Sequence, residues 1–390
     1  MMESQPLFND LIGVMTVIIM IPVFFLWLER TTRWKVFDFM PAIIWIFITP
    51  IFLSNLNVIP RSSEIYTTFR SFAVPLFIVL MLLDINIRQA MKVAWRGAAV
   101  MVLGAFGIVA GAVISFFLFR SGLPEGTWMG YGALAGSWIG GTGNLAAVAD
   151  SLNTPGEMVG MVVLVDNLVY VFYFPLILTC KRWAKPFNRF SQVPPEAEAH
   201  FNEAAQQVEK KTHEVHFRDA LTLLGWGFAA LAAATALSFV FPELPPVFTQ
   251  RTWAILLVTT IGIGLSATKL RDVPGTEPLS MTFVYIYMTM MGAQADLRSL
   301  GGAQWFIIAG FICIAVHFVF IVGGARLFRI DVSMAAVASV AAVGGAASAP
   351  VAAGFHREEL VPVSIMLALI GYALGNYLGV ATAYLCHLLV

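Results

Sequence analysis

Apolar stretches about as long as a bilayer is thick recur along the whole chain. A helix needs about 20 mostly apolar residues to cross the hydrocarbon core. These stretches are too long for strands, and they lack the alternation of an outer-membrane barrel. The sequence therefore predicts an all-α polytopic membrane protein with twelve candidate segments, at 9–28, 37–56, 64–83, 97–119, 127–150, 157–180, 218–241, 251–268, 278–296, 304–325, 331–354 and 361–389.

The low content of charged residues excludes several other classes of protein. Of the 390 residues, 59% are hydrophobic and 12% are charged, whereas soluble proteins carry about 25% charged residues. The 23 basic and 23 acidic side chains cancel, so the chain lacks the basic excess that nucleic-acid binding requires. The sequence contains no phosphate loop, nucleophile elbow or zinc-protease motif. We therefore expect no nucleic-acid partner, no cofactor and no enzymatic activity.

The first stretch is expected to be an uncleaved span. It is preceded by Glu3 and Asp10 and followed by Arg30, Arg33 and Lys35. A signal peptide has the opposite arrangement, with its positive charges in front of the apolar part. Because basic residues collect on the cytoplasmic side, this pattern predicts an N-terminus outside the cell.

A polar segment at 181–217 divides the chain into two parts of similar size. We expect three units: a first repeat with the N-terminal span at 1–180, a cytoplasmic linker at 181–217, and a second repeat at 218–390. The three cysteines are far apart and lie in or beside apolar stretches, so neither a disulfide framework nor a metal cluster is expected.

Each half contains one apolar stretch that is interrupted by glycine. The interruptions are Gly140-Gly141-Thr142-Gly143-Asn144 in the first half and Gly344-Gly345-Ala346-Ala347-Ser348-Ala349-Pro350 in the second. Asn86-Ile87-Arg88 and Asp296-Leu297-Arg298 stand at matching places before them. Paired breaks of this kind indicate the binding site of a transporter. The alternative is close packing of helices through small residues.

The distribution of basic residues favours hairpins at both interruptions. If all twelve segments cross the membrane, the repeats are parallel and Lys plus Arg divide 14 to 9 between the two sides. If 127–150 and 331–354 are instead re-entrant hairpins, the repeats have inverted topology and the division is 18 to 5. The positive-inside rule therefore predicts ten crossings and two hairpins.

One carboxylate at membrane depth is the leading candidate for an ion-binding group. Asp166 lies near the middle of the segment at 157–180, and Asn167 is beside it. A central Asp costs about 2.5–3.5 kcal/mol on insertion scales, so it is read as functional by default. With Thr142 and Asn144 it offers oxygen ligands that suit Na⁺ or a proton relay. The alternative for Asp166 is a structural hydrogen bond between helices.

Other polar groups in apolar segments receive weaker assignments. Asp84, Asp150 and Asp296 lie at segment ends and are expected to be solvated caps, and His317 is expected to bond to a neighbouring helix. The candidates for contact with a substrate are the glycines of both breaks and a few polar residues nearby. These are Gly140, Gly141, Gly143, Gly344, Gly345, Ser348, Pro350, Gln294 and Asn376.

The run GSWIGGTGNLAAVADSLNTPGEMVGMVVLVDNLVY resembles the YjcL-like family of bacterial membrane proteins, and the resemblance extends over nearly the whole chain. That family is similar to the cation:proton antiporter and anion transporter superfamily. The resemblance implies two inverted repeats, a core with paired discontinuous helices and a separate scaffold domain. Antiporters of this superfamily have an Asp-Asp or Asn-Asp pair after the first broken helix, and Asp166-Asn167 has the reverse order. The resemblance to antiporters implies crossed helices, whereas the charges favour hairpins.

These observations predict a secondary active transporter in the bacterial inner membrane. Na⁺-coupled symport of a small organic solute by alternating access is the leading function, with Na⁺ at Thr142, Asn144 and Asp166. A Na⁺/H⁺ antiporter and a non-transporting membrane scaffold are the alternatives. The expected partners are the solute, the lipid bilayer and a second copy of the chain in a homodimer.

Overall fold

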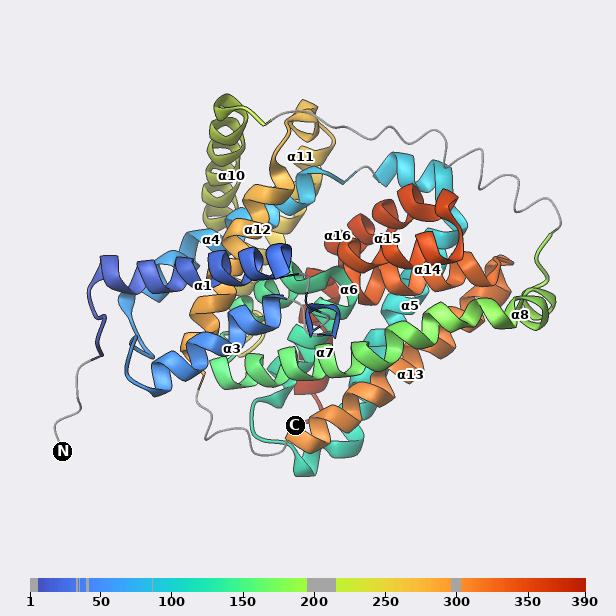
Figure 1. Cartoon of the computed structure of the whole chain (residues 1–390), viewed down its shortest axis with the longest axis horizontal. Helices are drawn as coiled ribbons and strands as arrows, with labels where there is room; N and C mark the ends of the chain where they lie inside the picture. Colours follow the sequence, from blue (N-terminus) through green and yellow to red (C-terminus); the bar gives the residue numbers. More distant parts are fainter. Residues whose placement is uncertain are drawn as a thin grey trace.

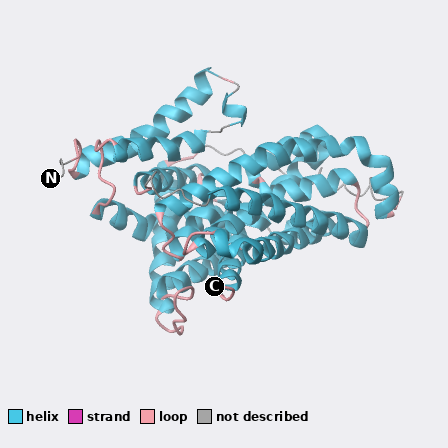
Figure 2. Cartoon of the chain, turned by 90° about the horizontal axis from the view of Figure 1, so that it is seen from below, coloured by secondary structure: helices cyan, strands magenta, loops and turns pink. Residues whose placement is uncertain are grey.

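The computed structural model describes residues 6–32, 34, 36–39, 42–85, 87–194, 215–295 and 303–390. These residues form helices, short 3-10 turns and one isolated bridge between Leu244 and Phe248, as Figure 2 shows. The predicted all-α fold is confirmed for this part of the chain. The α-helices are α1 (Leu11–Thr32), α2 (Val36–Phe39), α3 (Ala42–Asn55), α4 (Glu64–Leu83), α5 (Ile87–Phe119), α6 (Thr127–Ser151), α7 (Gly156–Thr179), α8 (Ala184–Ser191), α10 (Phe217–Ser238), α11 (Gln250–Ser266), α12 (Thr276–Ala293), α13 (Ala303–Phe328), α14 (Val332–Val343), α15 (Gly345–His356) and α16 (Val361–His387).

Seven helical stretches of the described chain are long and apolar enough to cross a membrane. Neither interrupted segment is among them, and α3, α11 and α12 are also outside this set. The count of ten crossings therefore stays a prediction. Two matching tripeptides at 86–88 and 296–298 fall wholly or partly outside the described residues, as does the linker from 195 to 214.

The helices form two packed groups (Figure 1). The flanking bundle consists of α1, α3, α4, α10, α11 and α12, in which α12 packs on α3 and α4 while α11 packs on α4 and α10. The hairpin bundle consists of α5, α6, α7, α13, α14, α15 and α16, in which α5 packs on α13 and α6 on α16. The groups meet where α6 and α16 contact α4 and α11.

The first interrupted segment folds back on itself and is called hairpin 1. Its turn is at Gly141, where φ is 78° and ψ is −173°, a conformation that is essentially restricted to glycine. Beyond the turn the chain returns along the first arm. A Cβ placed on Gly132 would be 3.1 Å from Leu152, and one on Gly136 would be 3.0 Å from Val148.

The second interrupted segment, α14 and α15, folds back in the same way and is called hairpin 2. Its turn is at Gly345, where φ is 60°. Asp331 at the start of the segment and Arg357 at its end form an ion pair of 2.9 Å. A straight helix of that length would hold the two side chains more than about 30 Å apart, so the ion pair fixes the two arms side by side.

The arms of hairpin 1 begin and end at one end of the molecule, here called the first end. The Thr252 hydroxyl donates to the backbone carbonyl of Ser151 at the end of the second arm. Trp128, at the start of the first arm, packs against His387 near the C-terminus. The backbone carbonyl of Leu389, next to the last residue, accepts a hydrogen bond of 2.6 Å from Arg120 after α5.

Hairpin 2 begins and ends at the opposite, second end of the molecule. The backbone N–H of Val332 donates to Asn188 of α8, and the amine of Lys181 donates to the carbonyls of Phe355 and His356 at the end of α15. The two hairpins thus point toward each other from opposite ends of the molecule. The predicted inverted repeat and the re-entry of both hairpins into the membrane stay predictions.

Glycines bring α6 very close to α16. Each helix has three of them spaced four residues apart, so they lie on one face. A Cβ on Gly379 would be 3.0 Å from the carbonyl oxygen of Gly132. The backbones of the two helices are therefore in direct contact. Small residues therefore allow close helix packing right beside the broken helices. The glycines serve this packing as well as forming the breaks, so the two interpretations of the glycine motifs are compatible. The glycines are Gly132, Gly136 and Gly140 on α6, and Gly371, Gly375 and Gly379 on α16.

The hairpin topology can be tested with single cysteines in a variant that lacks the native ones. Ser121 and Pro155 flank hairpin 1 and are exposed. Because both lie at the first end, Ser121→Cys and Pro155→Cys are expected to react with an impermeant maleimide from the same side of the membrane. Lys185→Cys, at the second end, is the control and should react from the other side. Labelling of the two flanking cysteines from opposite sides would contradict the hairpin.

The turn of hairpin 1 is expected to tolerate no side chain. Gly141→Ala should lower the free energy of unfolding by about 1–3 kcal/mol because alanine is strained at this φ and ψ. Gly264→Ala in α11 is the matched control, since no atom lies within 4 Å of the added Cβ and helical alanine is favoured over glycine. Thermal unfolding in detergent measures both. Equal stability of the two variants would show that Gly141 is not strained.

Candidate functional site

The turns of the two hairpins meet in the interior. A Cβ placed on Gly345 would be 3.8 Å from the Cα of Gly141. The ring of Tyr372, on α16, lies over both turns, because its Cε1 is 3.5 Å from the Cβ position of Gly141 and 3.7 Å from that of Gly345. The two glycine motifs are therefore in contact in the fold, although they are about 200 residues apart in sequence.

A buried amide network joins hairpin 1 to α16 and α11. Asn144 is 3% exposed, and its Nδ2 donates to the carbonyl of Tyr372 and to Oδ1 of Asn376, both at 2.9 Å. The Nδ2 of Asn376 donates in turn to the hydroxyl of Thr259 at 2.9 Å. The Oδ1 of Asn144 has no hydrogen-bond partner within the part of the chain that the structure describes, so one acceptor remains beside the turn.

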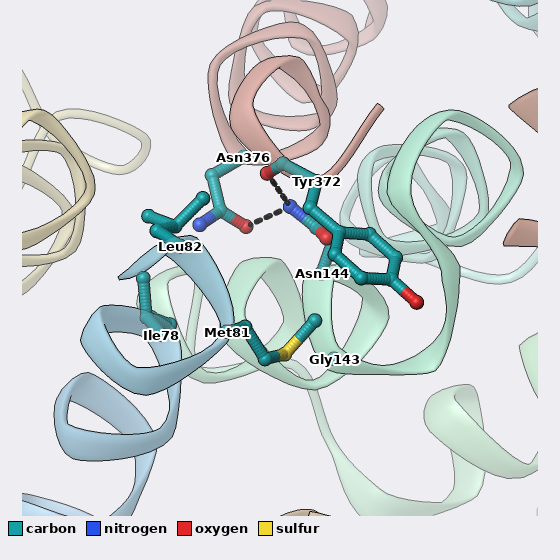
Figure 3. A pocket seen from close by; sticks show the side chains of 7 residues that line it. All are labelled: Ile78, Met81, Leu82, Gly143, Asn144, Tyr372 and Asn376. Atoms are coloured by element: carbon teal, nitrogen blue, oxygen red, sulfur yellow. Dashed lines mark hydrogen bonds between the residues drawn. The ribbon is translucent and has the colours of Figure 1, made fainter. Parts of the chain in front are cut away.

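This network borders a small cavity between hairpin 1 and the flanking bundle (Figure 3). Met81 and two other apolar residues of α4 form its opposite wall. Its volume is about 10 Å³, which is about the space needed for one water molecule. In this conformation the cavity fits a water or a small bare ion and excludes an organic solute.

Asp166 connects α7 to the first arm of hairpin 1. Its carboxylate accepts hydrogen bonds from the Ser137 hydroxyl at 2.7 Å and from the Trp138 indole N–H at 2.6 Å. One turn further along α7, the hydroxyl of Tyr170 reaches hairpin 2, where a Cβ added to Gly344 would collide with it. The helix that carries the acidic group therefore touches both hairpins.

The predicted ion-binding residues are divided between two places. Asn144 bonds to α16, whereas Asp166 bonds to the first arm of hairpin 1. Thr142 follows the turn and is partly buried, and the amide of Asn167 donates to Val163 in its own helix. Thr142 and Asn144 follow the turn of hairpin 1, and Asp166 bonds to the arm just before the turn. A single ion site shared by the four residues remains a prediction.

The predicted substrate-binding residues also separate. The glycines of both breaks lie at the meeting turns, and Asn376 lies in the amide network. Ser348 is next to Gly344 in space, and Pro350 lies within α15. Gln294 caps the end of α12, donates to Met290 of its own helix, and lies at the first end, away from the turns.

His317 is hydrogen-bonded to neighbouring helices, as predicted. Its Nδ1 is 2.8 Å from the carbonyl of Gly104, and its Nε2 is 3.0 Å from the hydroxyl of Ser339. A carbonyl can only accept, so Nδ1 carries the proton and Nε2 accepts from Ser339. The Tyr173 hydroxyl, 2.6 Å from Ser339, must then donate to it. The direction of this chain follows from the chemistry of its groups.

The prediction that Asp150 is a solvated cap is wrong. Its residue is 1% exposed, and its carboxylate is clamped by Arg70 of α4 and Arg251 of α11. Arg251 binds both oxygens, at 2.9 Å and 2.8 Å. The clamp ties the end of hairpin 1 to the flanking bundle. Asp84 does cap α4, and it accepts a hydrogen bond from the Thr276 hydroxyl.

Sequence reasoning missed several residues of the site. Tyr372 lies in an apolar segment, and Tyr170 is one of several aromatic residues near Asp166 that packing explains equally well. Ser137 and Trp138 stand just before the glycine motif, where nothing in the sequence distinguishes them from packing residues. Thr259 is one of many threonines that can bond to their own helix. One signal was available, because Asp166 and Tyr170 are four residues apart and therefore share a helix face.

A family model described as "Protein of unknown function (DUF819)" matches residues 16–389. The chain belongs to this family. It is also similar to the uncharacterized membrane protein YjcL of Bacillus subtilis (strain 168), with 28% identity over 342 residues. That match covers 84% of this chain and 85% of the relative. Together with the apolar helices, the relative's name supports a multi-pass membrane protein.

The clamp on Asp150 is expected to stabilise the fold. Asp150→Asn leaves two neighbouring arginines without a counter-charge and should lower the free energy of unfolding by about 3–5 kcal/mol, the usual result of breaking a buried pair. Glu125→Gln, an exposed acidic residue at the same end, is the control and should change it little. Thermal unfolding in detergent compares them, and equal melting temperatures would exclude the clamp as a stabilising contact.

Proposed function

We propose that this protein is a secondary active transporter whose solute and coupling ion bind where the turns of the two hairpins meet. The observation that carries the proposal is the contact of Gly141 with Gly345 beneath Tyr372. Broken helices at membrane depth expose backbone groups that lipid cannot satisfy, and they are tolerated when they line a buried or aqueous site. Binding at such breaks near the midplane is characteristic of secondary transporters.

The packing of the helices supports an inverted repeat as part of this proposal. The α4 and α12 helices pack on each other, as do α5 and α13. The cross-pairs also correspond, since α3 packs on α12 while α11 packs on α4, and α1 packs on α12 while α10 packs on α4. Hairpins that enter from opposite ends would then be re-entrant from opposite sides of the membrane.

The coupling ion proposed for this site is Na⁺. The acceptor Oδ1 of Asn144, the carboxylate of Asp166 and the hydroxyl of Thr142 are hard oxygen donors, which suit such a cation. The cavity beside Asn144 has room for an ion. Because Asp166 already accepts two hydrogen bonds, a bound cation would share the carboxylate with Ser137 and Trp138, or would replace one of them.

The solute proposed for this transporter is small and organic. The second arms of both hairpins begin at the meeting turns, so the positive ends of their helix dipoles face the site and favour an anionic group. Tyr372 offers an aromatic face at the same place. Since the cavity of about 10 Å³ is too small for a solute, the two bundles must move apart for binding.

Movement of the hairpin bundle against the flanking bundle would give alternating access. Few polar contacts cross this boundary in the described chain. They include the Asp150 clamp, the bond from Asn376 to Thr259, and the contact of 2.7 Å between the hydroxyls of Tyr377 and Thr260. An ion that binds better to one arrangement of the bundles shifts the population toward it.

Exchange of Na⁺ for H⁺, with Asp166 as the carrier, is the second candidate function. Asp166 has a carboxylate that can take up and release a proton, and it is bonded to the first arm of hairpin 1. An antiporter should acidify or alkalinise reconstituted vesicles when Na⁺ is added without any organic solute. A non-transporting scaffold, by contrast, should lose its function when the linker at 181–217 is deleted and keep it in Asp166→Asn.

Direct binding of radioactive sodium to the purified protein tests the proposed ion site. Asp166→Asn keeps the shape of the side chain but removes its charge, so we expect the affinity for Na⁺ to fall by about tenfold or more, which is the effect of losing about 1.4 kcal/mol. Glu157→Gln, on the first turn of the same helix, is the matched control and should bind normally. Unchanged Na⁺ binding in Asp166→Asn would remove this residue from the mechanism.

A further inference from the structure

An apolar cavity of about 270 Å³ lies at the second end of the molecule, away from the hairpin turns. It is formed between the end of α7, the helix α8, α13 and the first arm of hairpin 2. Its walls are hydrophobic, and the polar side-chain atoms among the lining residues are the sulfur of Cys180 and the indole N–H of Trp183. The wall residues that matter below are Leu176, Cys180, Trp183, Phe187, Phe318 and Ala335.

The volume and the lining limit what can occupy this cavity. Sites for drug-sized ligands are about 300–1,000 Å³ and contain a few polar groups for orientation. This cavity is slightly smaller and offers no such groups inside. A hydrocarbon chain fits this description, because it needs volume and apolar contact and no hydrogen bond.

The mouth of the cavity, unlike its walls, is beside exposed and positively charged residues. Trp183 lines it and is 68% exposed, and a tryptophan in this position is typical of a membrane interface. The stretch from 180 to 194 contains four basic residues and no acidic one. Arg326, at the end of α13, lies over the ring of Phe190 at 6.0 Å, and Phe190 packs on Phe187 of the cavity wall. Arg182, Lys185 and Arg189 belong to the same stretch of chain as the wall residues Trp183 and Phe187. Together with Arg326 they are called the basic rim.

We propose that this cavity binds one acyl chain of an anionic phospholipid, whose phosphate is held by the basic rim. The charge of the rim selects the head group, since clusters of Lys and Arg beside a membrane helix attract anionic lipid. Lys181 is not part of the rim, because its amine is bonded to the end of α15. The short helix α8 would then lie along the membrane surface (Figure 1).

The position of the cavity gives such a lipid a role. Val332, Ala335 and Ala336 of the first arm of hairpin 2 form one of its walls. One turn further along the same face of this arm is Ser339, which bonds to Tyr173 and His317. An acyl chain in the cavity would therefore support hairpin 2 from its base and hold that arm in the arrangement seen here.

Native mass spectrometry of the full-length protein can test the selection of the head group. The probes are phosphatidylglycerol and phosphatidylcholine with identical acyl chains. We expect the protein to retain phosphatidylglycerol in preference. The triple variant Arg182→Gln, Lys185→Gln and Arg189→Gln should bind it more weakly by on the order of 100-fold, because each basic residue near a membrane surface contributes a factor of about five.

The matched control removes the same number of charges from the flanking bundle at the same end. It is the triple variant Arg218→Gln, Lys269→Gln and Arg271→Gln, whose sites are distant from the cavity in the chain. It should retain phosphatidylglycerol as the native protein does. Equal retention of both lipids by the native protein, or equal loss in both triple variants, would overturn the proposal.

Alkylation of Cys180 tests the acyl chain separately. Cys180 lines the cavity and is partly exposed, whereas Cys313 and Cys386 are buried. Phosphatidylglycerol should slow the reaction of Cys180 with N-ethylmaleimide, and glycerol phosphate, which has the same charge but no chain, should not. If glycerol phosphate protects Cys180 equally, the site binds free phosphate and the cavity holds no chain. If neither probe protects it, the cavity is not a lipid site.

Discussion

The need to satisfy backbone groups at the two helix breaks constrains the rest of this structure. At Gly141 and Gly345 the helical hydrogen bonds stop inside the molecule, where the freed backbone groups need partners from the protein itself. The fold solves this by placing the two breaks against each other and covering them with Tyr372. The positions of the helices around the breaks depend on this contact between the two turns. The α16 helix must approach α6 closely, α7 must lie beside both hairpins, and the flanking bundle must close the remaining side through α4.

Different interactions hold the two hairpins in place, and the difference bears on function. Hairpin 1 is tied to the flanking bundle by the charges around Asp150 and by the amide network of Asn144 and Asn376. Hairpin 2 closes on itself through Asp331 and Arg357, and its base is held by Lys181 and Asn188 of its own bundle. Hairpin 1 and α16 therefore make the polar contacts named here across the boundary between the bundles, and α7 adds packing against α12 and α3. A movement of one bundle against the other would break contacts at hairpin 1 first.

The sequence predicted the helices and the hairpins better than it predicted the contacts. Apolar length identified the helices, and the 18 to 5 division of basic residues favoured hairpins, although it bears mainly on the first glycine segment because only Arg357 would change sides if the second one crossed. Asp166 and Asn376 were recognisable because each is a polar group inside an apolar helix. Asp150 was misjudged, because its position at a segment end indicates a solvated residue, and only the fold brings Arg70 and Arg251 to it across 80 and 101 residues. Tyr372 was missed for a related reason, since nothing local marks one tyrosine of an apolar helix as the residue that covers two distant turns.

The most direct test of this account asks whether the two turns touch in the membrane. Thr142 and Ala346 each follow one of the turn glycines, so Thr142→Cys and Ala346→Cys can be combined in a variant without the native cysteines. With a protease site in the linker at 195–214, the two halves separate on a denaturing gel unless a cross-link joins them. A short thiol cross-linker is expected to join the two halves of the protein in the Thr142→Cys, Ala346→Cys variant. It is expected to fail in the Thr142→Cys, Ser333→Cys variant, whose second thiol is at the base of hairpin 2. Separation of the halves in the first pair would contradict the meeting of the turns and the binding site built on it.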